Sequence, residues 1–199
     1  MVNVRAARPS DIDALLTLDT KLFIEDAGKH APLMAAAEIE LATTRLTLEP
    51  LRETHAAEMA SVLSDPEVYE FTGGSAPTLD DLTRRYRSQI EGPIDGGEAW
   101  RNWILRDTET GRAAGFLQAT IVGDEADIAW LVGRDFQGRG YAVEASAAMG
   151  AWLSSTEVGR ITAHVHPEHE KSQRVAAAIG LTRTDRVDEH GEEVWDSRL

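Results

Sequence analysis

Residues 126–145 read ADIAWLVGRDFQGRGYAVEA, and this stretch decides the fold of the chain. Its first part, from Asp127 to Val132, is apolar and predicts a β-strand, whereas its last part opens an alanine-rich helix. Between them, Gln137-Gly138-Arg139-Gly140 contains two glycines that allow a tight turn. A turn of this kind before a helix presents backbone N–H groups and the positive end of the helix dipole to an anion. The segment therefore indicates a pyrophosphate-binding loop, with a plain connecting turn as the alternative.

The segments on either side of this loop predict a mixed α/β protein. Upstream, short turns join three strands into an antiparallel meander, and helices that begin at capping hydroxyls precede it. Downstream, a strand, a helix closed by Gly180 and two further strands follow the helix after the loop. The predicted strands are 45–48, 99–106, 115–122, 127–132, 160–166 and two around His190-Gly191. Predicted helices begin at Thr54, at Ser64 and at Tyr141, and two more cover 78–92 and 167–179.

The charge balance of the chain is strongly acidic. Its 199 residues include 20 Lys and Arg against 34 Asp and Glu, which gives a formal net charge of -14. This balance disfavours nucleic acid and anionic membrane surfaces as partners, because both need clustered cations on the protein. The excess of carboxylates favours a cationic substrate, and solubility alone is the alternative explanation.

Several classes of site are excluded by the composition. The sequence contains no cysteine, which excludes disulfides, thiolate metal sites and cysteine nucleophiles. No apolar run approaches the ~20 residues of a membrane span, and the N-terminal stretch lacks the apolar core of a signal peptide. We therefore expect a soluble, cytoplasmic protein.

The loop and its surroundings resemble the GNAT acetyltransferases. The spacing Gln137-x-x-Gly140-x-Ala142 is similar to the acetyl-CoA loop of that family, and GRGYAVEA is similar to the RimJ/RimL-like branch, which acetylates protein N-terminal amines and various small amines. TTRLTLEPLRETHA, LSDPEVYEF and GLTRTD…GEEVW extend the resemblance over residues 43–199. It implies a GNAT fold, in which helices flank a central, mostly antiparallel mixed sheet with a splayed strand pair.

The resemblance also implies acetyl-CoA as the acetyl donor and no metal. The pyrophosphate would be bound mainly through backbone amides of the loop, and the pantetheine arm would pair with the end of the preceding strand. The implied cofactor-binding positions are Trp130, Leu131, Val132, Gln137, Gly138, Arg139, Gly140, Tyr141 and Ala142.

A second family signature departs from the expected pattern. Asn-x-x-Ser after a Pro-Glu pair is replaced here by Pro167-Glu168-His169-Glu170-Lys171-Ser172. Asparagine hydrogen-bonds the cofactor arm with its amide, whereas a neutral imidazole offers one donor and one acceptor. We expect His169 and Ser172 to contact the cofactor, Ser172 at the sulfur or the pantetheine. A non-catalytic relative that only binds acyl-CoA remains an alternative.

Two residues are candidates for the general base that deprotonates the amine. Asp127 lies where relatives often carry a glutamate near the amine, and a solvated carboxylate is the alternative role. His164 alternates with Thr162 and His166 along its strand and falls where an N-terminal acetylating relative carries its basic glutamate. An ordinary imidazole titrates near 6.5, which suits proton abstraction at neutral pH. A hydrogen-bonded structural histidine is the alternative for His164.

Acceptor contacts are implied at Glu144 and along the run from Asp65 to Phe71. Ordinary helix-end and capping roles are the alternatives for these residues. Trp100 and Trp103 point to opposite sides of one strand and are expected in the core. His164 and His166 share a face, but no third metal ligand is evident, and we expect no metal site. The implied acceptor residues are Asp65, Glu67, Tyr69, Phe71 and Glu144.

These observations predict an acetyl-CoA-dependent N-acetyltransferase. The acceptor would be a primary amine, either a protein N-terminus or a cationic small molecule, and it would attack directly because no covalent nucleophile is visible. An antibiotic-modifying acetyltransferase shares this chemistry and remains an alternative. Residues 1–42 resemble a truncated GNAT start and predict an ordered accessory segment, with helical turns over 34–41, that packs on the sheet edge, caps the acceptor groove or mediates a homodimer.

Overall fold

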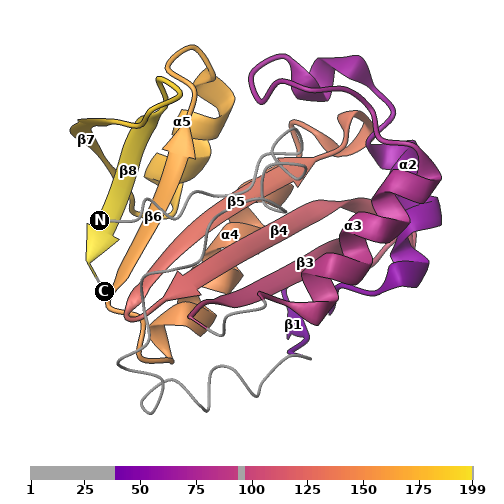
Figure 1. The fold of residues 1–199 in the computed structure, drawn as a ribbon, viewed down its shortest axis with the longest axis horizontal. Coiled ribbons are helices and arrows are strands. Elements are labelled where there is room, and N and C mark those ends of the chain that lie inside the picture. Colours follow the sequence, from indigo (N-terminus) through magenta and orange to yellow (C-terminus); the bar gives the residue numbers. More distant parts are fainter. Residues whose placement is uncertain (1–38, 94–96, 199) are drawn as a thin grey trace.

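The computed structural model describes residues 39–93 and 97–198, which fold around one sheet (Figure 1). This sheet has eight strands in the order β1-β2-β3-β4-β5-β6-β8-β7. All neighbouring strands run antiparallel except β5 and β6, which are parallel. The mixed, mostly antiparallel sheet predicted from the sequence is therefore confirmed. The strands are β1 (Leu41–Ala42), β2 (Leu46–Pro50), β3 (Ala99–Asp107), β4 (Ala113–Val122), β5 (Glu125–Val132), β6 (Arg160–Val165), β7 (Thr182–Val187) and β8 (Glu193–Arg198).

Helices cover both faces of this sheet. In Figure 1, α2 and α3 lie in front of β3 and β4, whereas α4 lies behind them. No helix in the described part of the chain is long and apolar enough to cross a membrane. The α-helices are α2 (Ala56–Val62), α3 (Leu79–Glu91), α4 (Tyr141–Ser154) and α5 (Glu170–Ala178), and the 3-10 helices are η1 (Glu53–His55), η2 (Pro66–Tyr69) and η3 (Arg134–Phe136).

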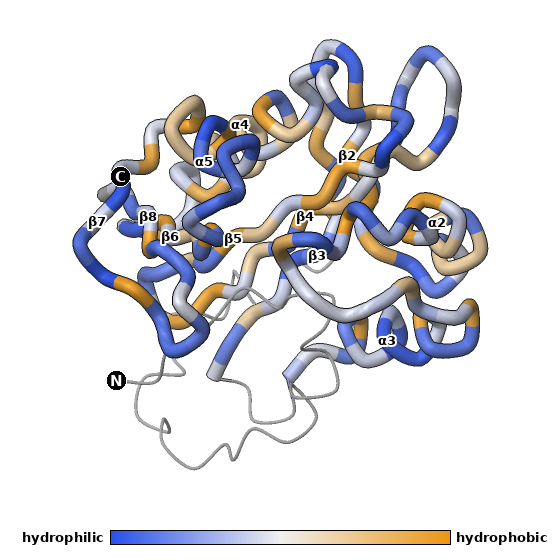
Figure 2. The backbone as a smooth tube through the Cα atoms, turned by 90° about the horizontal axis from the view of Figure 1, so that it is seen from above, coloured by the Kyte–Doolittle hydropathy of each residue, from blue (hydrophilic) through white to orange (hydrophobic). Residues whose placement is uncertain are grey.

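Alternation along the strands produces two separate cores. The core under α4 contains Trp103, whose ring meets that of Trp152 edge-on at 5.4 Å between centroids. The core under α2 and α3 contains Met59, Leu82 and Ile104. Trp103 also donates its indole N–H to the carbonyl of Ile39, at 2.6 Å. The tube coloured by hydropathy shows apolar residues along the central strands, whereas β7 is mostly hydrophilic (Figure 2).

The meander β3-β4-β5 is close-packed at Gly115. A Cβ built on this residue would lie 2.0 Å from the carbonyl oxygen of Leu131, which belongs to the neighbouring strand β5. No side chain fits at that distance, so a glycine is required at this position of the pairing between β4 and β5. The pairing brings the end of β5, and the loop after it, into a fixed position against β4.

Two element boundaries differ from the sequence-based expectations. Leu41 was expected in a helical turn but lies in β1, where it pairs with Leu48 of β2. The last helix begins at Glu170 instead of Pro167, because His169 occupies the N-cap and its ring accepts the N–H of Ser172. The accessory segment expected over 1–42 lies almost wholly outside the described residues. Its last residues supply β1 at the sheet edge.

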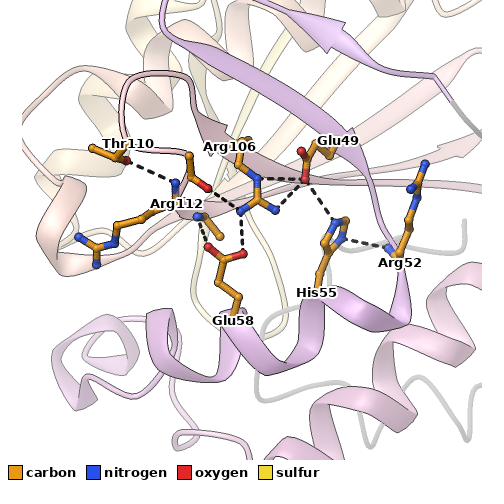
Figure 3. Close-up of polar contacts among 9 residues, drawn as sticks. Glu49, Arg52, His55, Glu58, Arg106, Thr110 and Arg112 are labelled. Carbon is orange, nitrogen blue, oxygen red and sulfur yellow. Dashed lines mark hydrogen bonds and ion pairs between the residues drawn. The ribbon is translucent and has the colours of Figure 1, made fainter.

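An ion-pair network fixes α2 to the sheet (Figure 3). Arg106 of β3 donates to Glu49 of β2 at 2.8 Å and to Glu58 of α2 at 2.7 Å. The hydrogen bond from Arg106 lowers the pKa of Glu49 below its ordinary value. His55 pairs with the same Glu49 oxygen at 3.3 Å, and burial lowers the pKa of its ring. One guanidinium thus links two strands and a helix.

Replacing Arg106 by methionine is expected to lower the free energy of unfolding by about 2 kcal/mol, because two half-buried carboxylates lose their cation. Urea unfolding at pH 7 measures the change, and Arg84→Met, which removes an exposed pair, is the control. Since the folded-state pKa of Glu49 is lowered, its contribution is complete above the unfolded value near 4.3 and is lost as the pH falls through the folded one. Equal stability of both variants at pH 7 would contradict a structural role for Arg106.

Candidate functional site

The site begins where the two parallel strands part. β5 and β6 pair only from Glu125 to Asp127 and from Arg160 to Thr162, and no further pairing between them is found among the described residues. β5 continues along β4 as far as Val132, while β6 continues along β8 as far as Val165. An extended chain can therefore add to the free edge of β5, over the residues that the sequence predicted for this purpose, Trp130, Leu131 and Val132.

The glycine-rich loop lies directly beyond this opening. Gly138 and Gly140 have φ angles of 75° and 79°, in the left-handed region that disfavours side chains. Gly140 is the N-cap of α4, so the first N–H groups of the helix, at Tyr141 and Ala142, follow it directly. The loop residues 137–140 are exposed. The loop thus has the conformation, the exposure and the adjoining helix N-terminus that an anion requires.

Polar groups from several elements hold this loop in place. Glu144, in the first turn of α4, accepts from the hydroxyl of Thr43 at 2.6 Å and from the backbone and side chain of Arg45 at 2.9 and 2.7 Å. Arg45 in turn donates to the carbonyl of Arg139 in the loop at 2.9 Å. The buried hydroxyl of Tyr141 donates to Asp107 of β3. Glu144, expected at the acceptor, anchors the start of α4 to the turn between β1 and β2.

Polar contacts also join the loop to both sides of the opening. The amide of Gln137 donates to the carbonyl of Val132 at 3.1 Å, and its oxygen accepts from Lys171 of α5 at 3.3 Å. Gln137 therefore fixes the loop to the end of β5 and reaches the helix that follows β6. The side chain of Gln137 thus holds in place the loop to which it belongs.

The first turn of α5 forms the opposite side of the opening. His169 and Ser172, both predicted to contact the cofactor, are joined there by the ring of His169, which accepts the N–H of Ser172 at 3.1 Å. Because this acceptor is Nδ1, the neutral ring carries its hydrogen on Nε2. Phe71 packs against His169, with 4.5 Å between ring centroids, and against His166 at 5.5 Å. The loop before α3 thereby reaches across to α5.

The rest of the acidic and aromatic run has contacts within the protein. Asp65 accepts the N–H of Glu67 at 2.9 Å and caps η2. Glu67 forms an ion pair with Arg134. Tyr69 is buried and donates to the carbonyl of Leu63 at 2.8 Å. Within this run, Phe71 contacts the start of α5, and Glu67 contacts the residues that follow β5.

Polar side chains cross the sheet on the face that α2 and α3 cover only in part. Register places Asn102 opposite Gln118, and Asp127 between Thr120 and Thr162. Alternation from Leu131, which belongs to the core under α2 and α3, puts Asp127 on the same face. A small crevice between this strip and α3 is lined by Arg85, Gln89, Asn102 and Gln118, among others. We call the following residues the polar strip: Asn102, Gln118, Thr120, Asp127, Thr162 and His164.

The two candidate bases meet at one end of the polar strip. The side chains of His164 and Asp127 are 9% and 4% exposed, and His164 Nε2 lies 3.8 Å from Asp127 Oδ2. Asp127 also accepts from the hydroxyl of Thr162 at 3.3 Å. The other ring nitrogen of His164 lies 3.0 Å from Asp188. Both candidates therefore lie beside the point where β5 and β6 part.

Three side chains of types that can bind a metal lie close together here, and His164 is one of them. Ligand atoms of His164, Asp188 and Glu192 come within 4.8 Å of one another. One Asp188 oxygen contacts the imidazole, and the other accepts the N–H groups of His190 and Glu192 at 2.8 and 2.9 Å. Both carboxylate oxygens of Asp188 therefore have partners within the fold.

Several functional neighbours were missed from the sequence. Arg45 and Thr43 hold the loop through Glu144, and Asp107 holds it through Tyr141. Asp188 contacts His164 from a hairpin turn. These partners come from separate strands and turns, so no local spacing signals them.

Comparisons with known proteins agree with this arrangement. A family model described as the acetyltransferase (GNAT) domain matches residues 45–182. No curated protein sequence matches the chain significantly.

Three solved structures share the fold. A candidate ribosomal-protein-serine acetyltransferase from Vibrio cholerae has a TM-score of 0.70 at 15% identity and covers 82% of this chain and 99% of its own. The microcin C7 self-immunity acetyltransferase, in complex with acetyl-CoA and AMP, has a TM-score of 0.67 at 14% identity, with 83% and 98% covered. Spermidine N-acetyltransferase from Vibrio cholerae, in complex with CoA and spermine, has a TM-score of 0.64 at 15% identity, with 79% and 96% covered.

A titration of His169 by NMR is expected to give a pKa below 6.5, because burial disfavours the charged ring and Lys171 adds to the effect. Phe71→Ala uncovers the ring and is expected to move that pKa back up. Since the folded-state pKa is the lower one, this residue's contribution to stability is complete above about 6.5 and is lost as the pH falls through the folded value. A His169 pKa at or above 6.5 in the unchanged chain would contradict the burial described here.

Proposed function

Because the chain belongs to the GNAT acetyltransferase domain family, we propose that it transfers the acetyl group of acetyl-CoA to a primary amine by direct attack of the amine on the thioester. The observation that carries the proposal is the parting of β5 and β6 beside a glycine-rich loop at the N-terminus of α4. An acyl donor with an extended arm and a pyrophosphate fits this pair of features.

On the donor side, the proposed contacts follow the chain around the opening. The backbone from Trp130 to Val132 pairs with the pantetheine arm. The loop amides and the start of α4 bind the pyrophosphate. His169, through its Nε2–H, and Ser172, through its hydroxyl, donate to the arm or to the sulfur. The proposed pyrophosphate-binding positions are Gln137, Gly138, Arg139, Gly140, Tyr141 and Ala142.

On the acceptor side, the amine would lie over the polar strip. The strip supplies amide and hydroxyl groups for orientation, and Asp127 supplies a carboxylate near the reacting end. Phe71 would close the side next to α5. The net charge of -14 favours a cationic acceptor, either a basic protein N-terminus, as in the RimJ/RimL-like branch, or a small polyamine-like molecule.

The proposed reaction needs one proton acceptor. His164 Nε2 takes a proton from the ammonium form of the acceptor, and the imidazolium that forms is stabilised by Asp127, 3.8 Å away. The neutral amine then attacks the thioester carbonyl, the C–S bond breaks, and the sulfur leaves with the electron pair. The proton released by the attacking nitrogen neutralises the departing thiolate. Holding both reactants in one groove supplies most of the acceleration.

The function is tested by incubating the protein with acetyl-CoA and a panel of amines while free CoA is measured. The panel contains peptides with different N-termini, spermidine and aminoglycosides. We expect CoA release with at least one cationic amine and an acetylated product by mass spectrometry. Tight binding of acetyl-CoA without turnover on any amine would indicate a non-catalytic acyl-CoA-binding module instead.

Gly140→Val tests whether the glycine-rich loop binds the donor. A β-branched residue cannot hold the φ of 79° that Gly140 adopts, so the loop is distorted and acetyl-CoA binding, measured by calorimetry, is expected to disappear. Arg139→Ala is the matched variant and is expected to bind almost normally, because the backbone carries the contact. Normal binding by a folded Gly140→Val protein would refute the assignment of the loop.

His164→Ala is expected to lower kcat roughly 10²- to 10⁴-fold while the Kd for acetyl-CoA stays the same, because the variant lacks the proton acceptor but keeps the donor site. His190→Ala, the same substitution at an exposed turn of the neighbouring hairpin, is the control. If His164→Ala retains near-normal turnover on the true acceptor, Asp127 becomes the better candidate for the base.

A further inference from the structure

The turn between β7 and β8 is built around the side chain of Asp188. Its Oδ1 accepts the backbone N–H groups of His190 at 2.8 Å and Glu192 at 2.9 Å. Its own N–H donates to the carbonyl of Glu192 at 2.9 Å. The side chain is 3% exposed. One carboxylate oxygen is thus fixed by the turn, and the orientation of the other follows from it.

That second oxygen lies 3.0 Å from Nδ1 of His164. Burial alone would raise the pKa of Asp188, but the N–H groups of Glu192 and His190 and the ring of His164 together lower it below its ordinary value. Asp188 is therefore an ionised carboxylate, which can only accept hydrogen bonds. Nδ1 must be the donor, so in the neutral ring the lone pair is on Nε2.

Nε2 faces the reactive end of the polar strip. It lies 3.8 Å from Asp127 of β5, and a carboxylate oxygen of Glu192, which precedes β8, lies within 4.8 Å of a nitrogen of the same ring. The distance to Asp127 is too long for a hydrogen bond from a neutral ring, which leaves the lone pair available. Once Nε2 takes a proton, the imidazolium lies between the carboxylates of Asp127 and Asp188.

We propose that Asp188 is a positioning residue that holds His164 with its hydrogen on Nδ1 and its lone pair on Nε2, directed toward the acceptor amine. This inference rests on the proposed acetyl transfer, in which His164 is the proton acceptor. The N–H bond of the ammonium breaks and a new N–H bond forms at Nε2, while the hydrogen bond from Nδ1 to Asp188 stays in place. Asp188 itself gains no proton and touches neither substrate.

Asp188→Asn tests the role without removing the turn. The amide oxygen can still accept the N–H groups of His190 and Glu192, so the amide nitrogen is left facing His164. A nitrogen that donates toward Nδ1 forces the ring hydrogen onto Nε2 and removes the lone pair from the acceptor side. The variant therefore reverses the tautomer while the hairpin keeps its backbone contacts. Asp185→Asn, the same change at an exposed position of β7, is the matched control.

The first measurement is independent of activity. ¹⁵N NMR of the ring nitrogens of His164 in the full chain is expected to show Nδ1 protonated in the unchanged protein and in Asp185→Asn, and Nε2 protonated in Asp188→Asn. An Nε2-protonated ring in the unchanged protein would overturn the proposal, even if the variant failed to fold.

The second measurement uses an amine that the unchanged protein acetylates. Asp188→Asn is expected to lower kcat by about 10²-fold and to leave the Kd for acetyl-CoA unchanged, whereas Asp185→Asn leaves both unchanged. A reversed tautomer with normal kcat would overturn the positioning role and leave acetyl transfer intact. Failure of the unchanged protein to acetylate any amine would refute the proposed function, and the positioning role of Asp188 in acetyl transfer with it.

Discussion

The short parallel pairing of β5 with β6 is the constraint on which the rest of the site depends. Three residues of each strand pair, and each strand then continues along a different partner, β5 along β4 and β6 along β8. A longer pairing would give a continuous sheet with no free edge at its centre, and no pairing would leave the two halves of the sheet unconnected. The strands part just after Asp127, so the candidate bases lie where the opening begins, and the loop and the start of α5 lie farther along it, beyond the ends of β5 and β6.

Around the opening, charged and polar side chains serve mainly to fix backbone. Glu144 and Arg45 hold the loop against β2, Asp107 holds its helix through Tyr141, and Asp188 closes a hairpin turn. Most of these groups are ordinary carboxylates with a cation, a hydroxyl or an N–H as partner. Rigid backbone is what a site needs when it binds through amides and orients a reaction by position.

Local patterns predicted the fold well because its elements carry their own signals. Apolar alternation marked the meander, capping residues marked α3, and the two glycines marked a turn whose left-handed φ angles the structure shares. The acidic and aromatic run was harder to interpret, because Asp65, Glu67 and Tyr69 have capping, ion-pair and core contacts that the sequence does not distinguish from a binding role. The partners of Glu144 and His164 come from other strands and turns, and only the folded chain brings them together.

The order of strands at this edge of the sheet also bears on how the site forms during synthesis. β8 lies between β6 and β7 although it follows both in the sequence. A chain that emerges from the ribosome N-terminus first therefore makes β6 with an open edge, and that edge stays unfilled until residues up to 198 are available. The imidazole of His164 can lie near Asp127 once β6 has paired with β5, but its contact with Asp188 forms only when the turn closes. The glycine-rich loop can fold early, whereas the contact between His164 and Asp188 is assembled among the last features of the domain, so the two sides of the opening are completed at different stages of synthesis.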